Sequence, residues 1–149
     1  MIYCKPILFT DEHGYTGKAP VYKTKEAACA DMALPHAINL NPGEVVHVDL
    51  LVGFEIPNGK KIIMYPRSSL LFKYGIMSPT SIIDSDYSGR HVHFIAINLD
   101  KEPVVLDKDT RVVQIECVPC EQVADWEREN AERTGGLRSF LLPTRLSPY

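Results

Sequence analysis

The stretch VVHVDLLVGFEIPNGKKIIMY (45–65) decides the fold class. Its two apolar runs, 45–56 and 61–65, are rich in Val and Ile, which favour the pleated surface of a β-strand. Between them, IPNGK (56–60) carries the Pro, Asn and Gly that a tight reversal of the chain needs. The stretch therefore predicts two strands separated by a turn.

The same alternation continues toward the C-terminus. Apolar runs are separated by turn signals, and many short strands with regular turns are typical of an all-β jelly-roll sandwich or barrel. Helix is expected to be scarce: KEAACADMA (25–33) is rich in Ala but has no clear apolar face, so we assign it to strand or loop. The further apolar runs are HVHFIAINL (91–99), EPVVL (102–106) and RVVQIECV (111–118).

Length and charge limit the classes of protein. A chain of 149 residues suits one domain over 1–149, which can bury about two thirds of its unfolded surface without a disulfide or a metal. Within it, 121–149 is predicted to be a C-terminal arm and tail, with EQVADWERENAERT (121–134) as the one plausible helix. Sixteen basic and 19 acidic residues, for a net charge of -3, argue against a nucleic-acid partner.

No basic, apolar leader begins the chain, and no apolar run reaches the roughly 20 residues that span a bilayer, so we expect a soluble cytoplasmic protein without a membrane partner. The cysteines are Cys4, Cys29, Cys117 and Cys120. A single CVPC pair lacks the other ligands of a zinc site and the βαβ context of a redox motif. Packed free thiols are the favoured interpretation for all four.

Two polar clusters carry the chemistry: PRSSLLFKYGI (66–76) and SIIDSDYSG (81–89). An Arg-Ser-Ser cluster can clamp phosphate oxygens, and an Asp-x-Asp-Tyr cluster adds carboxylates close by in sequence. Together they indicate a phosphoryl-transfer site, which needs charge neutralisation beside a group that orients the nucleophile.

With ACADM (28–32), TRVVQI (110–115) and RTGGLRSF (133–140), these clusters form five motifs, and over about residues 20–140 the chain resembles the trimeric dUTP diphosphatase (dUTPase) family. The resemblance implies a jelly-roll-like β-barrel and hydrolysis of dUTP to dUMP and pyrophosphate, with Mg²⁺ bound on the triphosphate. It also implies a homotrimer whose active sites draw motifs from different subunits. Divergence in the first and fifth motifs is compatible with a viral or phage source.

The third motif supplies the implied catalytic group. Asp84 would orient and deprotonate the attacking water, although an Asp before a turn commonly bonds its own backbone. Tyr87 would pack against the deoxyribose and exclude a 2′-hydroxyl; alone, it would be an edge-strand tyrosine. Asp86 is either part of a network at the subunit junction or solvated.

The second and fourth motifs imply phosphate contacts from Arg67, Ser68 and Ser69, and from Gln114 to a phosphate or a neighbouring carboxylate. Asp109 and Thr110 stand where the family has Gly and Asp. In the first motif, Asp31 would hold magnesium through water. Cys29 there replaces a family glycine.

The fifth motif departs most from the family form RGxGGFGST. Gly135 and Gly136 keep the hinge and Ser139 keeps a hydroxyl, while Arg133 is offset by about one position. Leu137 replaces the Phe that stacks on the base, at a loss of roughly 1 to 3 kcal/mol of stacking. Arg138 replaces a glycine and offers compensating positive charge.

Main-chain groups of a hairpin over residues 82–95 are expected to recognise uracil, and one residue more than the family spacing before Asn98 predicts a β-bulge. Two alternatives stay open. A dCTP deaminase shares the fold but needs a Glu on the strand after the third motif, and 91–99 has no carboxylate. A binding or regulatory protein with weakened catalysis would explain the altered arm.

Overall fold

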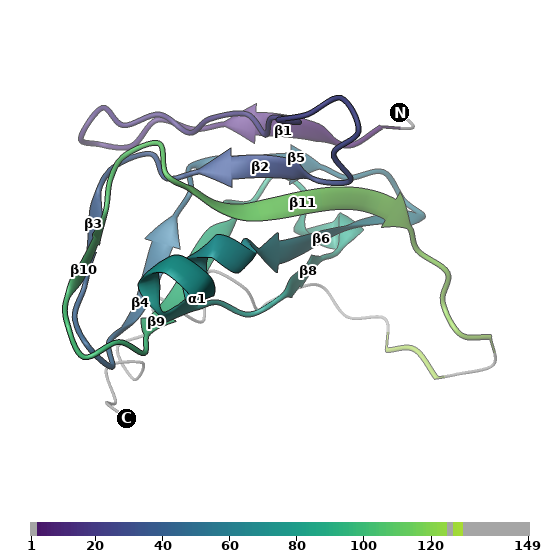
Figure 1. The fold of residues 1–149 in the computed structure, drawn as a ribbon. Coiled ribbons are helices and arrows are strands. Elements are labelled where there is room, and N and C mark those ends of the chain that lie inside the picture. The colour runs from purple at the N-terminus through teal and green to yellow at the C-terminus, as the bar shows by residue number, and fades with distance from the viewer. Residues whose placement is uncertain (1–2, 125–126, 130–149) are drawn as a thin grey trace.

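The computed structural model describes residues 3–124 and 127–129. Its regular secondary structure is mostly short antiparallel strands, in the jelly-roll-like arrangement that the sequence predicts (Figure 1). The strands are β1 (Lys5–Leu8), β2 (Ala30–Ala33), β3 (Ile38–Leu40), β4 (Val45–Asp49), β5 (Val52–Glu55), β6 (Lys60–Pro66), β7 (Ile76–Met77), β8 (Ser81–Ile83), β9 (His93–Asn98), β10 (Val104–Leu106) and β11 (Arg111–Pro119).

The strands group into four small sheets, which Figure 1 shows wrapped around a common interior. One has the order β2-β11-β6-β8 and a second the order β4-β9-β7, while β1 pairs with β5 and β10 with β3. Strands distant in sequence are thereby neighbours: β2 and β6 both pair with β11. These pairings bring the first, second and fourth motifs together.

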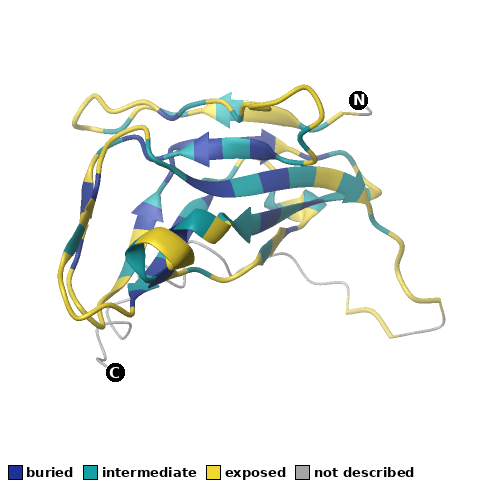
Figure 2. Ribbon diagram, viewed as in Figure 1, coloured by how far each residue is buried: buried dark blue, intermediate teal, exposed yellow. Residues whose placement is uncertain are grey.

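Burial alternates along the strands, as the pleat requires. On β6, Ile62 and Met64 are buried, and on β9 Phe94, Ala96 and Asn98 are buried (Figure 2). The side chain of Asn98 is satisfied, because its Nδ2 donates to the carbonyls of Leu40 and Glu102 at 3.0 and 2.9 Å. The core is otherwise apolar among the residues classed as buried.

Two details of pairing correct the sequence predictions. Residues 82–95 do not form a hairpin, because β8 pairs with β6 whereas β9 pairs with β4 and β7. The extra residue before Asn98 produces no bulge in β9, which pairs with β4 without interruption from His93 to Ile97. A register shift lies instead between Arg111 and Val113 on β11.

Helix is scarce, as predicted, but its place was not predicted. Residues 68–74 form α1 (Ser68–Tyr74), directly after the strand β6. The helix ends at Gly75, whose φ of 69° suits glycine and whose N–H bonds to the carbonyls of Leu70 and Leu71. A short 3₁₀ turn, η1 (Ser85–Tyr87), follows Asp84. The predicted helix 121–134 is absent from residues 121–124 and 127–129, and its remainder lies outside the described residues.

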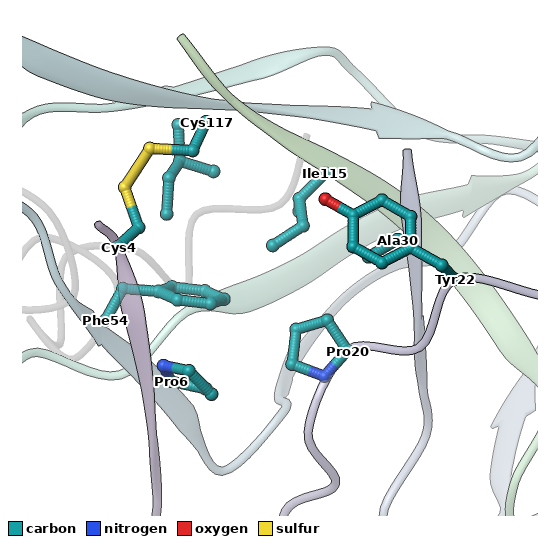
Figure 3. Close-up of a pocket in the computed structure, with 9 residues that line it drawn as sticks. Cys4, Pro6, Pro20, Tyr22, Ala30, Phe54, Ile115 and Cys117 are labelled. Atoms are coloured by element: carbon teal, nitrogen blue, oxygen red, sulfur yellow. A yellow bond between two sulfur atoms is a disulfide. The ribbon is translucent and has the colours of Figure 1, made fainter. Parts of the chain in front are cut away.

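The prediction of four free thiols is wrong for one pair. Cys4, just before β1, forms a disulfide with Cys117 on β11. Their separation of 113 residues hides this proximity from the sequence, and the fold brings the two Cα atoms to 6.6 Å. The disulfide borders an apolar pocket of about 180 Å³ that Phe54, Ile115 and Pro20 also line (Figure 3). Cys29 and Cys120 are free.

Among the residues that the structure describes, no helix is long and apolar enough to cross a bilayer.

Candidate active site

Three motifs meet at one end of the sheet β2-β11-β6-β8. On β2, Asp31 lies opposite Gln114 of β11, and Gln114 in turn lies opposite Tyr65 of β6. Arg67 follows the last residue of β6, and its N–H donates to the carbonyl of Val112 at 3.2 Å. The resulting pocket measures about 410 Å³ and is lined by Lys23, Thr24, Ala27, Ala28, Cys29, Asp31, Arg67, Ser68, Arg111 and Gln114.

Asp31 is the anionic centre of this pocket, which we call the Asp31 pocket. Its carboxylate accepts a hydrogen bond from Nη1 of Arg111 at 3.0 Å, and Nε of Arg67 lies 3.8 Å away. The Asp31 side chain is 11% exposed, against 28% for Arg67 and 38% for Arg111. The carboxylate therefore sits beneath two guanidinium groups whose outer edges reach solvent, an arrangement suited to phosphate oxygens.

Two cationic or polar residues of the Asp31 pocket were missed by the sequence analysis. Lys23 and Thr24 precede the first motif and line the pocket together with Arg67 and Arg111. A Lys in an irregular segment gives no signal of its own, since only the isolated bridge between Val21 and Asp31 brings the segment to β2. Ser68 lines the Asp31 pocket, whereas Ser69 lines an adjacent one with Arg67 and Arg111.

Gln114 and Cys29 also line the Asp31 pocket. Nε2 of Gln114 donates to the carbonyl of Pro66 at 3.4 Å, which is long for a hydrogen bond. Burial, and then the negative charges of Glu116 and Asp31, raise the pKa of the Cys29 thiol. Cys29 is thus held in its neutral form, and it adds no negative charge to the pocket.

The departure in the fourth motif has a conformational explanation. Asp109, which stands where the family has Gly, adopts a positive φ of 72°. This left-handed region favours glycine, and Asp and Asn are the side chains that tolerate it best after glycine. Asp109 can therefore form the turn before β11 in place of glycine, and Arg111 after this turn pairs with Asp31.

Asp84 lies in a different pocket of the same chain. It follows β8 and precedes η1, and the pocket of about 570 Å³ around it is lined by Gly59, Lys60, Lys61, Asp84, Ser85, Asp86, Cys120 and Gln122. Its backbone is extended, and its side chain makes no capping hydrogen bond to the turn. Lys60 and Lys61 were also missed, since the pairing of β6 with β8 places them there.

Tyr87 is fixed at both ends of its ring. The ring packs against the buried core, its hydroxyl donates to the carbonyl of His91 at 2.7 Å, and the Arg90 guanidinium lies 5.6 Å from the ring centroid. A ring held in this way is a rigid surface for steric exclusion. Asp86 lies in the Asp84 pocket. Arg133, Gly135, Gly136, Leu137, Arg138 and Ser139 lie outside the described residues.

Comparison with known proteins identifies the family. The dUTPase family model matches residues 16–138. The chain belongs to the dUTPase family. A deoxyuridine 5′-triphosphate nucleotidohydrolase of Nautilia profundicola is 35% identical over 119 residues, which cover 73% of this chain and 83% of that protein. The enzyme of the same description from Wolbachia sp. subsp. Brugia malayi is 37% identical over 133 residues, covering 83% and 85%.

Solved structures of dUTPases share the fold. The dUTPase of Streptococcus mutans superposes with a TM-score of 0.70 at 26% identity, covering 79% of this chain and 97% of that one. A mutant dUTPase of phage phi11 of S. aureus superposes with a TM-score of 0.71 at 17% identity, covering 87% and 97%. In this dUTPase fold, the Asp31 pocket and the Asp84 pocket remain the two candidate parts of the active site.

Proposed function

We propose that the protein hydrolyses dUTP to dUMP and pyrophosphate. Its relatives in the dUTPase family are named deoxyuridine 5′-triphosphate nucleotidohydrolases, which supports the substrate. The observation that carries the proposal is the convergence of Asp31, Arg67, Ser68, Arg111 and Gln114 from separate strands into one pocket. Such a set of cationic and neutral donors around one carboxylate suits a triphosphate. The proposed setting is the free nucleotide pool of the cytoplasm.

A homotrimer with shared active sites is the assembly that we propose. Ile83, next to Asp84, pairs with Ile62 on β6, whereas Arg67 follows the other end of β6. Five strand residues at about 3.3 Å each separate these positions by about 17 Å. A carboxylate must lie within hydrogen-bond reach of the attacking water, so Asp84 and Arg67 of one chain are too far apart to act on the same α-phosphate. A second copy would supply the missing half.

Within such a site, we assign the described residues the following roles. Asp84 would orient and deprotonate the attacking water. Phosphate oxygens would be bound by Arg67, Ser68, Ser69 and Gln114. Arg111, which is paired with Asp31, would add positive charge beside them. The ring of Tyr87 would reject a 2′-hydroxyl. Arg133, Gly135, Gly136, Leu137, Arg138 and Ser139 are proposed to close over the substrate as the arm.

Magnesium fits this pocket as an ion that arrives on the substrate. Among the described residues lining the Asp31 pocket, Asp31 is the one carboxylate, and it already faces two guanidinium groups. A hard cation that keeps most of its water shell needs few protein ligands, so Asp31 is suited to hold it through water. Bound there, the ion would neutralise charge on the triphosphate. A dUTPase of phage phi11 is described as coordinating a structural Mg(II) ion.

A second candidate function is binding or regulation with weakened catalysis, which the replacement of the family Phe by Leu137 and of the family Gly by Cys29 favours. Incubating the protein with each common nucleoside triphosphate and Mg²⁺, and measuring pyrophosphate and monophosphate, separates the two. Hydrolysis confined to dUTP supports the proposed enzyme. Tight dUTP binding without turnover supports the binding protein, and deamination of dCTP would support neither.

A further inference from the structure

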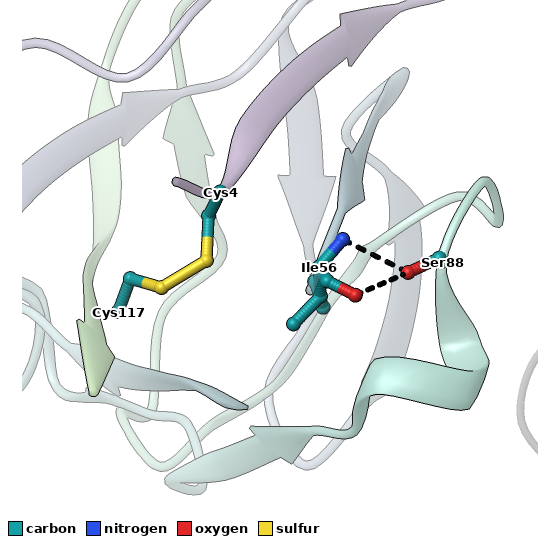
Figure 4. Close-up of a disulfide and its surroundings, with 4 residues drawn as sticks. All are labelled: Cys4, Ile56, Ser88 and Cys117. Carbon is teal, nitrogen blue, oxygen red and sulfur yellow. Dashed lines mark hydrogen bonds between the residues drawn. A yellow bond between two sulfur atoms is a disulfide. The ribbon is translucent and has the colours of Figure 1, made fainter. Parts of the chain in front are cut away.

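The segment that carries Asp84 and Tyr87 follows β8 in the chain and is also hydrogen-bonded to the end of β5. Past the last residue of β5, the buried Ile56 donates its N–H to Oγ of Ser88 at 2.9 Å. The same Ser88 hydroxyl lies 2.7 Å from the carbonyl of Ser85, the first residue of η1. Figure 4 shows the Ser88 oxygen facing both main-chain polar atoms of Ile56.

The single proton of the Ser88 hydroxyl decides how these contacts are shared. It goes to Ser85, whose carbonyl is closer than that of Ile56 at 3.3 Å, while a lone pair of the oxygen accepts the Ile56 N–H. The hydroxyl therefore closes the 3₁₀ turn and ties it to β5 in one step. Ser85 is adjacent to Asp84, so this bond acts one residue from the carboxylate.

Main-chain contacts support the same attachment but leave it incomplete. The N–H of Gly89 donates to the carbonyl of Phe54 at 2.9 Å. Arg90 passes so close to β5 that a Cβ on Gly53 would lie 2.5 Å from its carbonyl oxygen. These contacts hold the segment after Tyr87, whereas the Ser88 hydroxyl ties the η1 turn itself to the end of β5.

We infer that Ser88 is a positioning residue: its hydroxyl holds the Asp84–Tyr87 turn in the geometry that the proposed dUTP hydrolysis requires. The inference rests on the proposed function. Ser88 touches no reacting atom in this account and acts through the turn alone. Misplacing a catalytic group by a fraction of an ångström slows the chemical step more than it weakens substrate binding.

The decisive comparison is Ser88→Thr against Ser88→Val, because these side chains have nearly the same shape and differ by a hydroxyl. Ser88 is exposed as a residue, which leaves room for the extra methyl group. Steady-state pyrophosphate release is measured well below the melting temperature of each variant. We expect Ser88→Thr to keep at least half of the wild-type kcat, and Ser88→Val and Ser88→Ala to lose about tenfold with KM changed less than twofold.

Ser78→Ala is the matched control. The Ser78 hydroxyl donates to the carbonyl of Ile95 at 2.7 Å, so its loss removes a comparable side-chain to backbone bond away from the site. Wild-type kcat in Ser78→Ala, with a lowered melting temperature, completes the expected result. The inference is overturned if Ser88→Val matches Ser88→Thr in kcat, or if Ser78→Ala loses as much activity as Ser88→Ala. Absence of wild-type activity would instead refute the proposed function.

Discussion

Asp84 and Arg67 line different pockets of the same chain, at opposite ends of β6. Both residues belong to motifs that the proposed reaction needs on one substrate molecule. The separation along β6 therefore makes the site a property of the assembly. The shared site can therefore be tested by activity as well as by the mass of the assembly.

Mixed assemblies of two inactive variants should regain activity. Asp84→Asn removes the proposed base and Arg67→Ala removes a phosphate ligand, so each variant alone should be nearly inactive. If a site takes Asp84 and Arg67 from different subunits, random mixing leaves both wild-type residues in about a quarter of the sites. Co-expressed and co-purified subunits should then show about a quarter of wild-type kcat. No recovery in verified mixed trimers, or a monomer with full activity, would contradict the shared site.

Replacing Asp31 should weaken substrate binding. Asp31→Asn keeps the shape but removes the charge that holds the guanidinium groups of Arg111 and Arg67 in place. We expect kcat/KM for dUTP to fall by about ten- to a hundredfold, which corresponds to about 1.4 to 2.7 kcal/mol. Steady-state kinetics at saturating Mg²⁺ check this. Asp11→Asn is the control, since the Asp11 carboxylate accepts hydrogen bonds from the main-chain N–H groups of His13 and Tyr15 at 2.9 Å and lines neither pocket. Equal losses in both variants would contradict a specific role for Asp31.

Reduction of the disulfide should lower stability without removing the sites. The link between Cys4 and Cys117 joins residues 113 apart, and a cross-link that closes a long loop stabilises a protein by about 2 to 4 kcal/mol. For a chain of this size the melting temperature should fall by about 5 to 15 °C in excess dithiol. Thiol titration of the unfolded protein should give two thiols before reduction and four after it.

Two double variants make that comparison specific. Cys4→Ser with Cys117→Ser should melt at the lower temperature with or without dithiol. Cys29→Ser with Cys120→Ser should respond to dithiol as the wild type does, because those cysteines are free. Four thiols in the untreated protein would show that the disulfide is absent in solution.

Acidification should destabilise the fold through His93. Burial lowers the pKa of His93 below its ordinary value of 6.5; the Asp49 carboxylate opposes this shift, and His91 and His47 add to it. The unfolded chain takes up a proton as the pH falls through about 6.5, whereas the folded chain resists it. The free energy of unfolding should therefore fall as the pH is lowered below 6.5 and be insensitive to this residue above it.

Denaturant titrations between pH 5 and 8 measure the slope, and His93→Gln should flatten it below pH 6.5. His13→Gln is the matched control, since His13 is exposed, and it should retain the wild-type slope. Parallel curves for wild type and His93→Gln would assign the acid sensitivity to other groups.

The strands could be predicted from sequence because their signals are local. Runs such as KIIMY and RVVQIECV fall within β6 and β11, and the turns at Gly43 and Gly59 have the positive φ that glycine supplies. The helix α1 was missed because its seven residues were interpreted only as a phosphate-binding motif, although Lys73 and Gly75 form an ordinary helix C-terminus. The pairing of Cys4 with Cys117 depends on strand order, which no local pattern contains.

The candidate site was predictable in its residues but not in its geometry. The resemblance pointed to Asp31, Arg67 and Gln114, and the pairing of β2, β11 and β6 brings them together. Lys23 and Lys61 were missed because other strands and loops bring them to their pockets, and Ser88 because its partner Ile56 is 32 residues away. Their sequence neighbours give no indication of these placements.

The most direct test of the central claim is pyrophosphate release from dUTP by the wild type and by Asp84→Asn, with binding of a non-hydrolysable dUTP analogue measured for both. The account predicts turnover by the wild type, a loss of kcat of at least a hundredfold in Asp84→Asn, and analogue affinities within threefold of each other. A wild-type rate of turnover in Asp84→Asn would contradict it.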